Sequence, residues 1–453
     1  MDTVYFGKFN FEIWEFVLLP VYLFIIWFIS AWIKNSNIEK KPEYQYFMPG
    51  LWLKIIGSII LGLIYVYYYQ GGDTMGYYQS GLAFTNLFYQ RPVEAVLTFI
   101  SPATSENLSH FNTQTGYPLL YLYQDIQTFT VIRLITPLLV ISFKSYIITA
   151  VMLAWISYYG IWKIYRLFVA YYPELRLQIA IGFLFFPSVW FWGSGILKDT
   201  FTFSATCLFV YTFHNIFIKR RKALINIIWL IISMYLLLAI KPYIVIVLLP
   251  GSIIWIFFNQ LTKIRNQLLI WILIPCIYLF SVGGGFIIFK TISDQLGEYS
   301  IENIFTKAVV TQQDLKKEYY GGNSYDIGNF DPTVSGVLSK FPIATISGLY
   351  RPFIWETSNI MMLFSGLESL FLMFLTIWTL FKVGVLQFIR ITIRTPLLVF
   401  TLSFSLLMAF AMGLTTPNFG ALVRFKIPLL PFFISSMFIF YHICKIGKKH
   451  NIS

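Results

Sequence analysis

Apolar runs of similar length recur along the whole chain, separated by short segments that hold most of the charged residues. One membrane crossing needs roughly 20 apolar residues, so each run predicts a transmembrane helix. About 11 crossings are expected, at residues 13–33, 50–69, 145–168, 177–195, 199–218, 223–240, 242–261, 267–290, 360–382, 396–414 and 427–444. The shorter run from Val131 to Phe143 lies between Arg133 and Lys144 and predicts an interfacial or re-entrant helix. The pattern therefore predicts an all-α polytopic membrane bundle, with a single membrane domain over residues 1–453.

The basic residues give the predicted orientation, because short cytoplasmic loops carry an excess of Lys and Arg. Alternate loops hold these residues, at Lys34, Lys40, Lys41, Lys163, Arg166, Arg176, Lys219, Arg220, Arg221, Lys222, Lys263, Arg265, Lys382, Arg390, Arg394, Lys445, Lys448 and Lys449. The N-terminus is then outside and the C-terminus inside. Two long segments, 70–144 and 291–359, are expected on the outer side, with interfacial helices. Loops of that size usually have a function.

Composition supports the membrane class. The chain is 57% hydrophobic and 12% charged, and no soluble domain of this length buries so much apolar surface. The net charge of +13 would indicate nucleic acid in a soluble protein. In a membrane protein basic residues orient helices and meet anionic lipid, so membrane lipid is the expected partner and nucleic acid is not. Cys207, Cys276 and Cys444 fall in predicted helices and offer neither a disulfide framework nor metal-ligand spacing.

The outer segment 70–144 begins with Gly71, Gly72 and Asp73, directly after the second predicted span. Glycines let the backbone leave a helix sharply, so Asp73 is expected at the membrane edge. A carboxylate in that position can accept a proton from a hydroxyl group or orient that group. The alternative is structural, because Asp is a common N-cap before a helix.

Lys198 and Asp199 are adjacent charged residues in an apolar stretch that is long enough for two crossings. A charge at that depth is costly and indicates function by default. The loop charges place the pair in an outer turn, where Lys198 suits a phosphate and Asp199 fixes or balances it. The alternative is a structural ion pair that reaches the surface. Neighbours on a helix do not face each other, which disfavours a mutual pair.

Arg351 and Glu356 flank Pro352 and Trp355 at the mouth of a predicted span. The Pro and Trp residues are typical of an interfacial anchor, which is the structural interpretation of this segment. The two charged residues beside the anchor also favour a functional site.

Arg424, Lys426 and Lys241 are expected on the outer side, against the positive-inside trend. With Lys198 and Arg351 they are predicted to form one cationic patch at a common depth. Such a patch suits a phosphate or pyrophosphate, because Arg gives bidentate contacts to phosphate oxygens.

This arrangement resembles the membrane-embedded glycosyltransferases of the GT-C type, whose early outer loop carries an acidic residue near the membrane. Asp73 is the position that matches, although it follows the second span here and is a single carboxylate. Segments 187–199, 351–356 and 416–428 are similar to bacterial surface-polysaccharide polymerases, including their Pro-Ser-x-x-x-Trp-x-Ser-Gly-x-x-Lys-Asp pattern. The resemblance implies an enzyme whose outer arginines hold a lipid pyrophosphate.

The predicted protein is a membrane glycosyltransferase or polysaccharide polymerase at the outer face of the bacterial cytoplasmic membrane. It would transfer sugar from a polyprenyl-(pyro)phosphate-linked donor to a glycan acceptor. The expected catalytic or orienting carboxylates are Asp73, Asp199 and Glu356. The residues expected to hold the leaving phosphate and offset its charge are Lys198, Lys241, Arg351, Arg424 and Lys426.

No cofactor motif is present in the sequence, and a divalent metal ion held by Asp73 with a second carboxylate stays open. Two other classes also stay open. A flippase or transporter of lipid-linked glycans would have charged residues at mid-membrane and pseudo-symmetric halves, and the sequence analysis identifies neither. A non-catalytic scaffold for envelope assembly would explain the long outer loops without any site.

Overall fold

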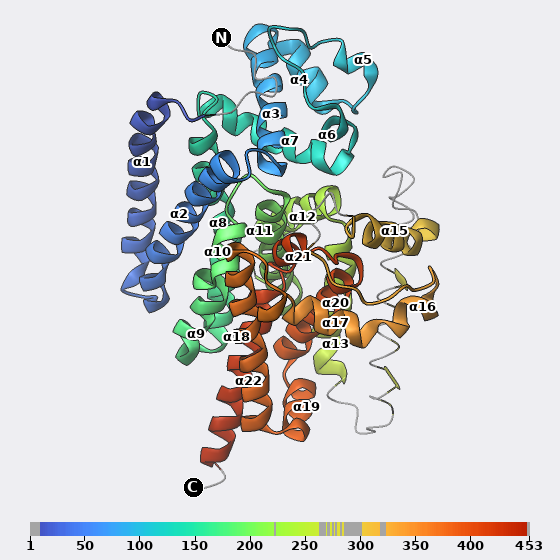
Figure 1. Cartoon of the computed structure of the whole chain (residues 1–453). Coiled ribbons are helices and arrows are strands. Elements are labelled where there is room, and N and C mark those ends of the chain that lie inside the picture. The colour runs from blue at the N-terminus through green and yellow to red at the C-terminus, as the bar shows by residue number, and fades with distance from the viewer. Residues whose placement is uncertain are drawn as a thin grey trace. The chain divides into compact units, whose positions relative to one another are not determined.

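A computed structural model describes residues 10–221, 223–261, 301–317 and 323–450, with scattered positions between 269 and 284 (Figure 1). All regular secondary structure in these residues is helical, and Ser324 and Asn418 form an isolated bridge. By length and composition, eight described helices can cross a membrane: Ile13–Ile38, Pro42–Tyr68, Tyr146–Tyr171, Lys198–Ile218, Ala223–Ile240, Ile360–Val383, Pro396–Thr415 and Leu430–Gly447. This confirms an all-α, multi-pass membrane protein in coarse form.

The predicted crossing at 177–195 is not one continuous α-helix. The segment consists of α9 (Arg176–Ala180), a π-helical turn (Ile181–Phe185) and α10 (Pro187–Trp192). Between the last two pieces, Phe186 has an extended backbone with φ −67° and ψ 125°. The physical reason is Pro187, since the residue before a proline is driven out of the α region. The predicted crossing at 267–290 lies largely outside the described residues.

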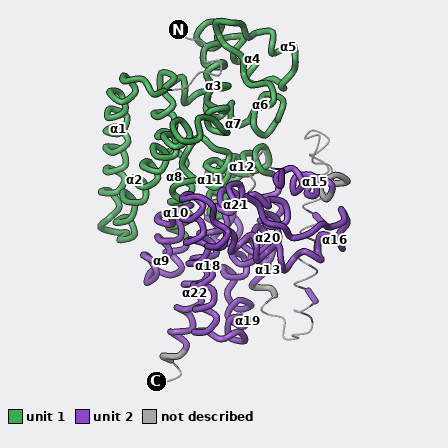
Figure 2. Tube along the Cα trace, in the orientation of Figure 1, with its two compact units in different colours: residues 1–167, 189–211, 228–241 green, residues 168–188, 212–227, 242–453 purple. Residues whose placement is uncertain are grey.

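The chain divides into two compact units (Figure 2). Unit 1 comprises residues 1–167, 189–211 and 228–241, and unit 2 comprises residues 168–188, 212–227 and 242–453. Four helices contribute residues to both units: α8 (Tyr146–Tyr171), α10, α11 (Lys198–Phe213) and α12 (Ala223–Ile240).

The other helices of unit 1 are α1 (Ile13–Ile38), α2 (Phe47–Leu63), α3 (Asp73–Gln90), α4 (Pro92–Ile100), α5 (Ser105–Leu108), α6 (Leu120–Gln124) and α7 (Ile126–Ile141). A π-helical turn (Ile64–Tyr68) extends α2, and α7 confirms the helix expected near 131–143. The core of unit 1 packs α3 against α7 and includes Phe84, Ile135 and Leu139. Ile196 and Ile240 belong to the same core, so it fixes the chain just before Lys198 and Lys241.

Besides α9, the other helices of unit 2 are α13 (Tyr243–Leu261), α15 (Ile301–Asp314), α16 (Val334–Ser339), α17 (Phe341–Tyr350), α18 (Ile360–Val383), α19 (Val385–Arg394), α20 (Pro396–Thr415), α21 (Phe419–Phe425) and α22 (Leu430–His450). Helices α17 and α20 approach so closely that Gly413 has no room for a side chain. A Cβ at this position would lie 1.8 Å from the Ala344 carbonyl oxygen. Small residues at a helix contact allow such packing in membranes. It holds the end of α17, and with it Arg351, against α20.

Candidate functional site

Asp73 is the first residue of α3, and its side chain is exposed. The N-cap is Gly72 with φ 95°, so the expectation that Asp73 itself caps the helix is wrong. Gly72 is required there, because a Cβ would lie 2.9 Å from the Tyr65 ring and the positive φ disfavours other residues. Thr74 is fixed by a 2.6 Å hydrogen bond to the Tyr146 hydroxyl. The helix start therefore holds Asp73 in an accessible position.

Lys198, at the start of α11, pairs with Asp125, the N-cap of α7. The two side chains lie 3.1 Å apart and are 21% and 47% exposed. Burial alone would raise the pKa of Asp125, but the Lys198 charge and a hydrogen bond from Thr128 hold it below the ordinary value of 3.8. Asp125 therefore stays ionised at neutral pH, and Lys198 is presented partly exposed beside it.

Asp199 pairs with Lys241 and not with its neighbour Lys198. Lys241 Nζ lies 2.5 Å from Asp199 Oδ1, and both residues are buried, at 6% and 2% exposure. Asp199 lies in the first turn of α11 and Lys241 directly follows α12, so each charge also complements a helix dipole. Lys198 and Asp199 thus pair with different residues. This agrees with the prediction that adjacent side chains on a helix do not face each other.

Lys54 corrects the expectation that the sequence has no charged residue at mid-membrane. It lies near the middle of the membrane-length segment Pro42–Tyr68 and is only 2% exposed. Its ammonium donates a hydrogen bond to the Gly193 carbonyl oxygen, directly after α10. The sequence did not reveal Lys54, because a single Lys lowers the mean hydropathy of an apolar run only slightly.

Unit 2 holds a second cluster, around Arg351, at the end of α17. Arg351 Nη1 lies 3.3 Å from Glu356 Oε1, and the side chains are 22% and 19% exposed. The guanidinium carbon lies 4.8 Å from the Tyr325 ring centroid, a cation–π distance. Glu356 is oriented by the Phe353 N–H, which donates to its other oxygen at 2.9 Å. Arg351 is thus held from two sides and keeps part of its surface open.

Lys426 lies behind Arg351 and is 1% exposed. Its ammonium donates to the Arg351 carbonyl oxygen at 2.9 Å and to Ser369 Oγ at 3.0 Å. Burial lowers the pKa of Lys426 to about 8, although the negative charge of Glu368 acts to raise it. Lys426 therefore holds the Arg351 backbone in place, and its own ammonium is buried away from any external ligand.

Glu368 is a second charged residue inside a membrane-length helix, α18. Its carboxylate accepts hydrogen bonds from the backbone N–H of Ser188, at 2.6 Å, and from the Ser188 hydroxyl. Glu368 therefore binds the first turn of α10.

The segment 323–326 also belongs to the cluster of unit 2. The Tyr325 N–H donates to the Pro417 carbonyl oxygen at 3.1 Å, and the Phe419 N–H donates to the Asn323 carbonyl oxygen at 3.0 Å. The Tyr325 hydroxyl donates to the Gly413 carbonyl oxygen at 2.8 Å, and burial raises the pKa of this phenol, so it stays protonated. The segments 323–326, 351–356 and 416–426 thus meet in unit 2.

The structure therefore brings the predicted residues together in two groups. Unit 1 holds Lys198, Asp199 and Lys241, and unit 2 holds Arg351, Glu356 and Lys426. Arg424 lies in the last turn of α21, half-buried, with its guanidinium carbon 5.9 Å from the Phe425 ring centroid. The joint patch of five cations stays a prediction.

Sequence analysis missed Asp125, Tyr325, Ser369 and Glu368. Asp125 had a readable signal, since an Asp directly before an apolar helical run is a typical N-cap. Glu368 had another, as the only carboxylate in the predicted span 360–382. Tyr325 and Ser369 carried no distinguishing pattern. Among the described residues, no group of three or more His, Cys, Asp or Glu side chains is placed to hold a metal ion.

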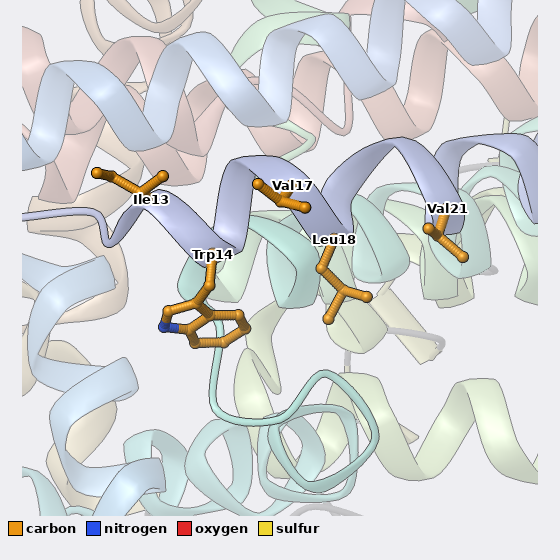
Figure 3. Close-up of a pocket in the computed structure, with 5 residues that line it drawn as sticks. All are labelled: Ile13, Trp14, Val17, Leu18 and Val21. Atoms are coloured by element: carbon orange, nitrogen blue, oxygen red, sulfur yellow. The ribbon is translucent and has the colours of Figure 1, made fainter.

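A shallow hollow on α1 is of a different kind (Figure 3). Its lining is entirely apolar: Ile13, Trp14, Val17, Leu18 and Val21. It holds no group that could bind phosphate or move a proton, and it lies on a helix with mostly exposed apolar side chains. The hollow belongs to the apolar surface and not to either charged cluster.

The fold and these clusters define a class: an all-α protein of membrane-length helices, with charged groups held at helix ends. Comparison with family models, with curated proteins and with solved structures finds no match for the chain.

Proposed function

We propose that the protein is a membrane glycosyltransferase or polysaccharide polymerase that uses a polyprenyl-(pyro)phosphate-linked sugar donor. The proposal places the reaction at the outer face of a bacterial cytoplasmic membrane. One observation carries it: the half-buried Arg351, at the end of the ten-residue helix α17, is fixed by Glu356, Tyr325 and Lys426. A guanidinium with fixed orientation suits bidentate binding of a phosphate whose lipid tail lies among apolar helices.

In the proposed reaction, the acceptor hydroxyl oxygen forms a bond to the anomeric carbon of the donor sugar. The bond from that carbon to the phosphate oxygen breaks, and its electron pair stays on the phosphate. Arg351 offsets this developing negative charge, and Glu356 keeps the guanidinium in place. The hydroxyl proton passes to a carboxylate base; Asp73 of unit 1 is the sequence-based candidate and is tested separately from Arg351.

The test uses purified full-length protein in detergent and a donor with a radiolabelled sugar. Arg351→Lys should lower kcat about 10²-fold or more, because Lys cannot replace bidentate contacts to a charge that forms in the transition state. Glu356→Gln tests the orientation of Arg351, and Asp73→Asn tests the proton acceptor separately. Lys317→Gln, at an exposed pair with Asp314, is the control. The same variants are analysed in the native host for glycan length and amount.

Wild-type transfer rates and wild-type glycans in both Arg351→Lys and Asp73→Asn would refute this mechanism. A wild-type protein that forms no glycosidic bond in detergent would reject the transferase itself.

A flippase for the same lipid-linked glycans is the second candidate, favoured by Lys54 and Glu368. Ionisable residues inside membrane-length helices and a discontinuous helix are typical of transport pathways. Sealed vesicles discriminate the two functions. A flippase moves the labelled donor between leaflets without changing it, whereas a transferase also forms product when the membrane is dissolved.

A further inference from the structure

Helix α19 (Val385–Arg394) carries three different kinds of side chain on three faces. Residues four apart lie on one side of a helix, so the side chains of α19 form rows along its surface. One row is buried, one is apolar and exposed, and one is basic. None of these residues takes part in the two charged clusters.

The buried face packs within unit 2. Ile391 is buried, and the ring of Phe388 stacks on Phe440 of α22 with centroids 3.9 Å apart. Figure 1 shows α19 beside the C-terminal half of α22, as this stacking requires. The orientation of α19 about its own axis is therefore fixed by packing.

The apolar row points away from the protein. It consists of Val385, Ile389 and Ile393, which are 63%, 43% and 37% exposed. Leu386, at 85% exposure, borders this row. Leaving so many large apolar side chains in water is unfavourable at about 25 cal/mol per Å². The row therefore needs an apolar medium.

The basic row continues from Leu386 with Arg390 and Arg394, both exposed. Lys382, also exposed, precedes the helix, and the chain contains no Asp or Glu after Glu368. Nothing acidic in this segment balances these cations, so their complement is a negatively charged surface.

The neighbours of α19 place it at a membrane face. It lies between α18 and α20, both long and apolar enough to cross, and Gly384 with φ 83° turns the chain out of α18. A helix of this length cannot cross by itself, since its ten residues extend about 15 Å. An amphipathic helix with a basic face in this position is typical of an interfacial helix.

We infer that α19 lies in the membrane interface and binds anionic lipid headgroups. Val385, Ile389 and Ile393 lie in the acyl region, while Lys382, Arg390 and Arg394 contact lipid phosphates. The opposite face stays docked on α22. This site is separate from the proposed sugar-transfer site and does not depend on that function.

The experiment places a bimane probe on Leu386→Cys in the full chain, with Cys207, Cys276 and Cys444 replaced, in nanodiscs. Brominated phosphatidylcholine and brominated phosphatidylglycerol are compared as quenchers, with aqueous iodide as the polar quencher. We expect lipid quenching to exceed iodide quenching and the anionic lipid to be preferred. Arg390→Gln with Arg394→Gln should reduce that preference about 25-fold, because each basic residue near an anionic surface contributes roughly fivefold.

Two control variants keep the result interpretable. Arg390→Lys with Arg394→Lys should retain the preference, since the charge is kept. Lys316→Gln with Lys317→Gln removes the same charge elsewhere and should change nothing.

Three results would each overturn the proposal. Quenching by iodide but not by lipid would place α19 in water. Equal quenching by both lipids that the arginine variants do not change would show contact without headgroup recognition. Protection from lipid and iodide together would show that a protein covers this face.

Discussion

Replacing Lys241 with Met removes one member of the buried Asp199–Lys241 pair. The two atoms lie 2.5 Å apart and both side chains are at least nine-tenths buried, at 7% and 3% exposure. An isolated carboxylate is then left without its partner, which costs about 3–5 kcal/mol when a buried pair is broken. Lys241→Met should therefore lower the free energy of unfolding by about that amount.

The double variant Lys241→Met with Asp199→Leu separates charge from shape. It removes both charges and replaces them with apolar groups, which is often neutral for a buried pair. We expect it to recover most of the stability lost by Lys241→Met. Lys198→Met is the matched control, because the pair of Lys198 with Asp125 is more exposed and such pairs contribute about 0–1 kcal/mol.

The assay is reversible unfolding in mixed micelles, followed by circular dichroism and by tryptophan fluorescence. A loss below about 1 kcal/mol in Lys241→Met would refute the reasoning, since the buried carboxylate would then have another partner or water. A double variant that is as unstable as the single variant would refute it too. If the double variant folds but transfers no sugar, the Asp199–Lys241 pair contributes to activity, as the sequence predicted for both residues.

Two further predictions concern stability. The lowered pKa of Asp125 means that its pairing with Lys198 stabilises the fold above pH 4 or so and is lost as pH falls through the folded pKa. The stability difference between wild type and Asp125→Asn should therefore shrink on acidification, and a constant difference would contradict the assignment. Gly413→Ala should destabilise by about 1–3 kcal/mol through overpacking against α17. Gly447→Ala is its control, because a Cβ there meets nothing within 4 Å, and equal melting temperatures of the two variants would contradict the prediction.

Hydrophobic periodicity was sufficient for the long helices. The predicted crossings at 13–33, 360–382 and 396–414 correspond to α1, α18 and α20 with small shifts at their ends. These segments are readable because burial in lipid requires an apolar surface over the whole length. The segment 177–195 is equally apolar, and its composition does not show where the backbone leaves the α region. Pro187 was the local signal, and its effect depends on the chain that packs around the break.

The candidate site was less predictable than the helices. The residue types and their positions at span ends could be read, which gave Arg351, Glu356 and Lys198. Their partners could not, since Asp125 is 73 residues from Lys198 and Lys426 is 75 residues from Arg351. Exposure was also hidden: Lys241 and Lys426 have the charge that a phosphate site needs, but tertiary packing buries both. Only the three-dimensional structure shows whether a basic side chain is accessible to a ligand or is buried against another residue.

The two ionisable residues inside membrane-length helices can be weighed by what they bind. Glu368 accepts from the Ser188 N–H in the first turn of α10, and Lys54 donates to the Gly193 carbonyl oxygen just beyond its last residue. A short helix is unstable by itself, and a negative group at its start and a positive group at its end both complement its dipole. Each charge thus has a structural reason to be at that depth. Their depth alone is therefore weak evidence for a transport pathway, and the assay in sealed vesicles decides between the flippase and the transferase.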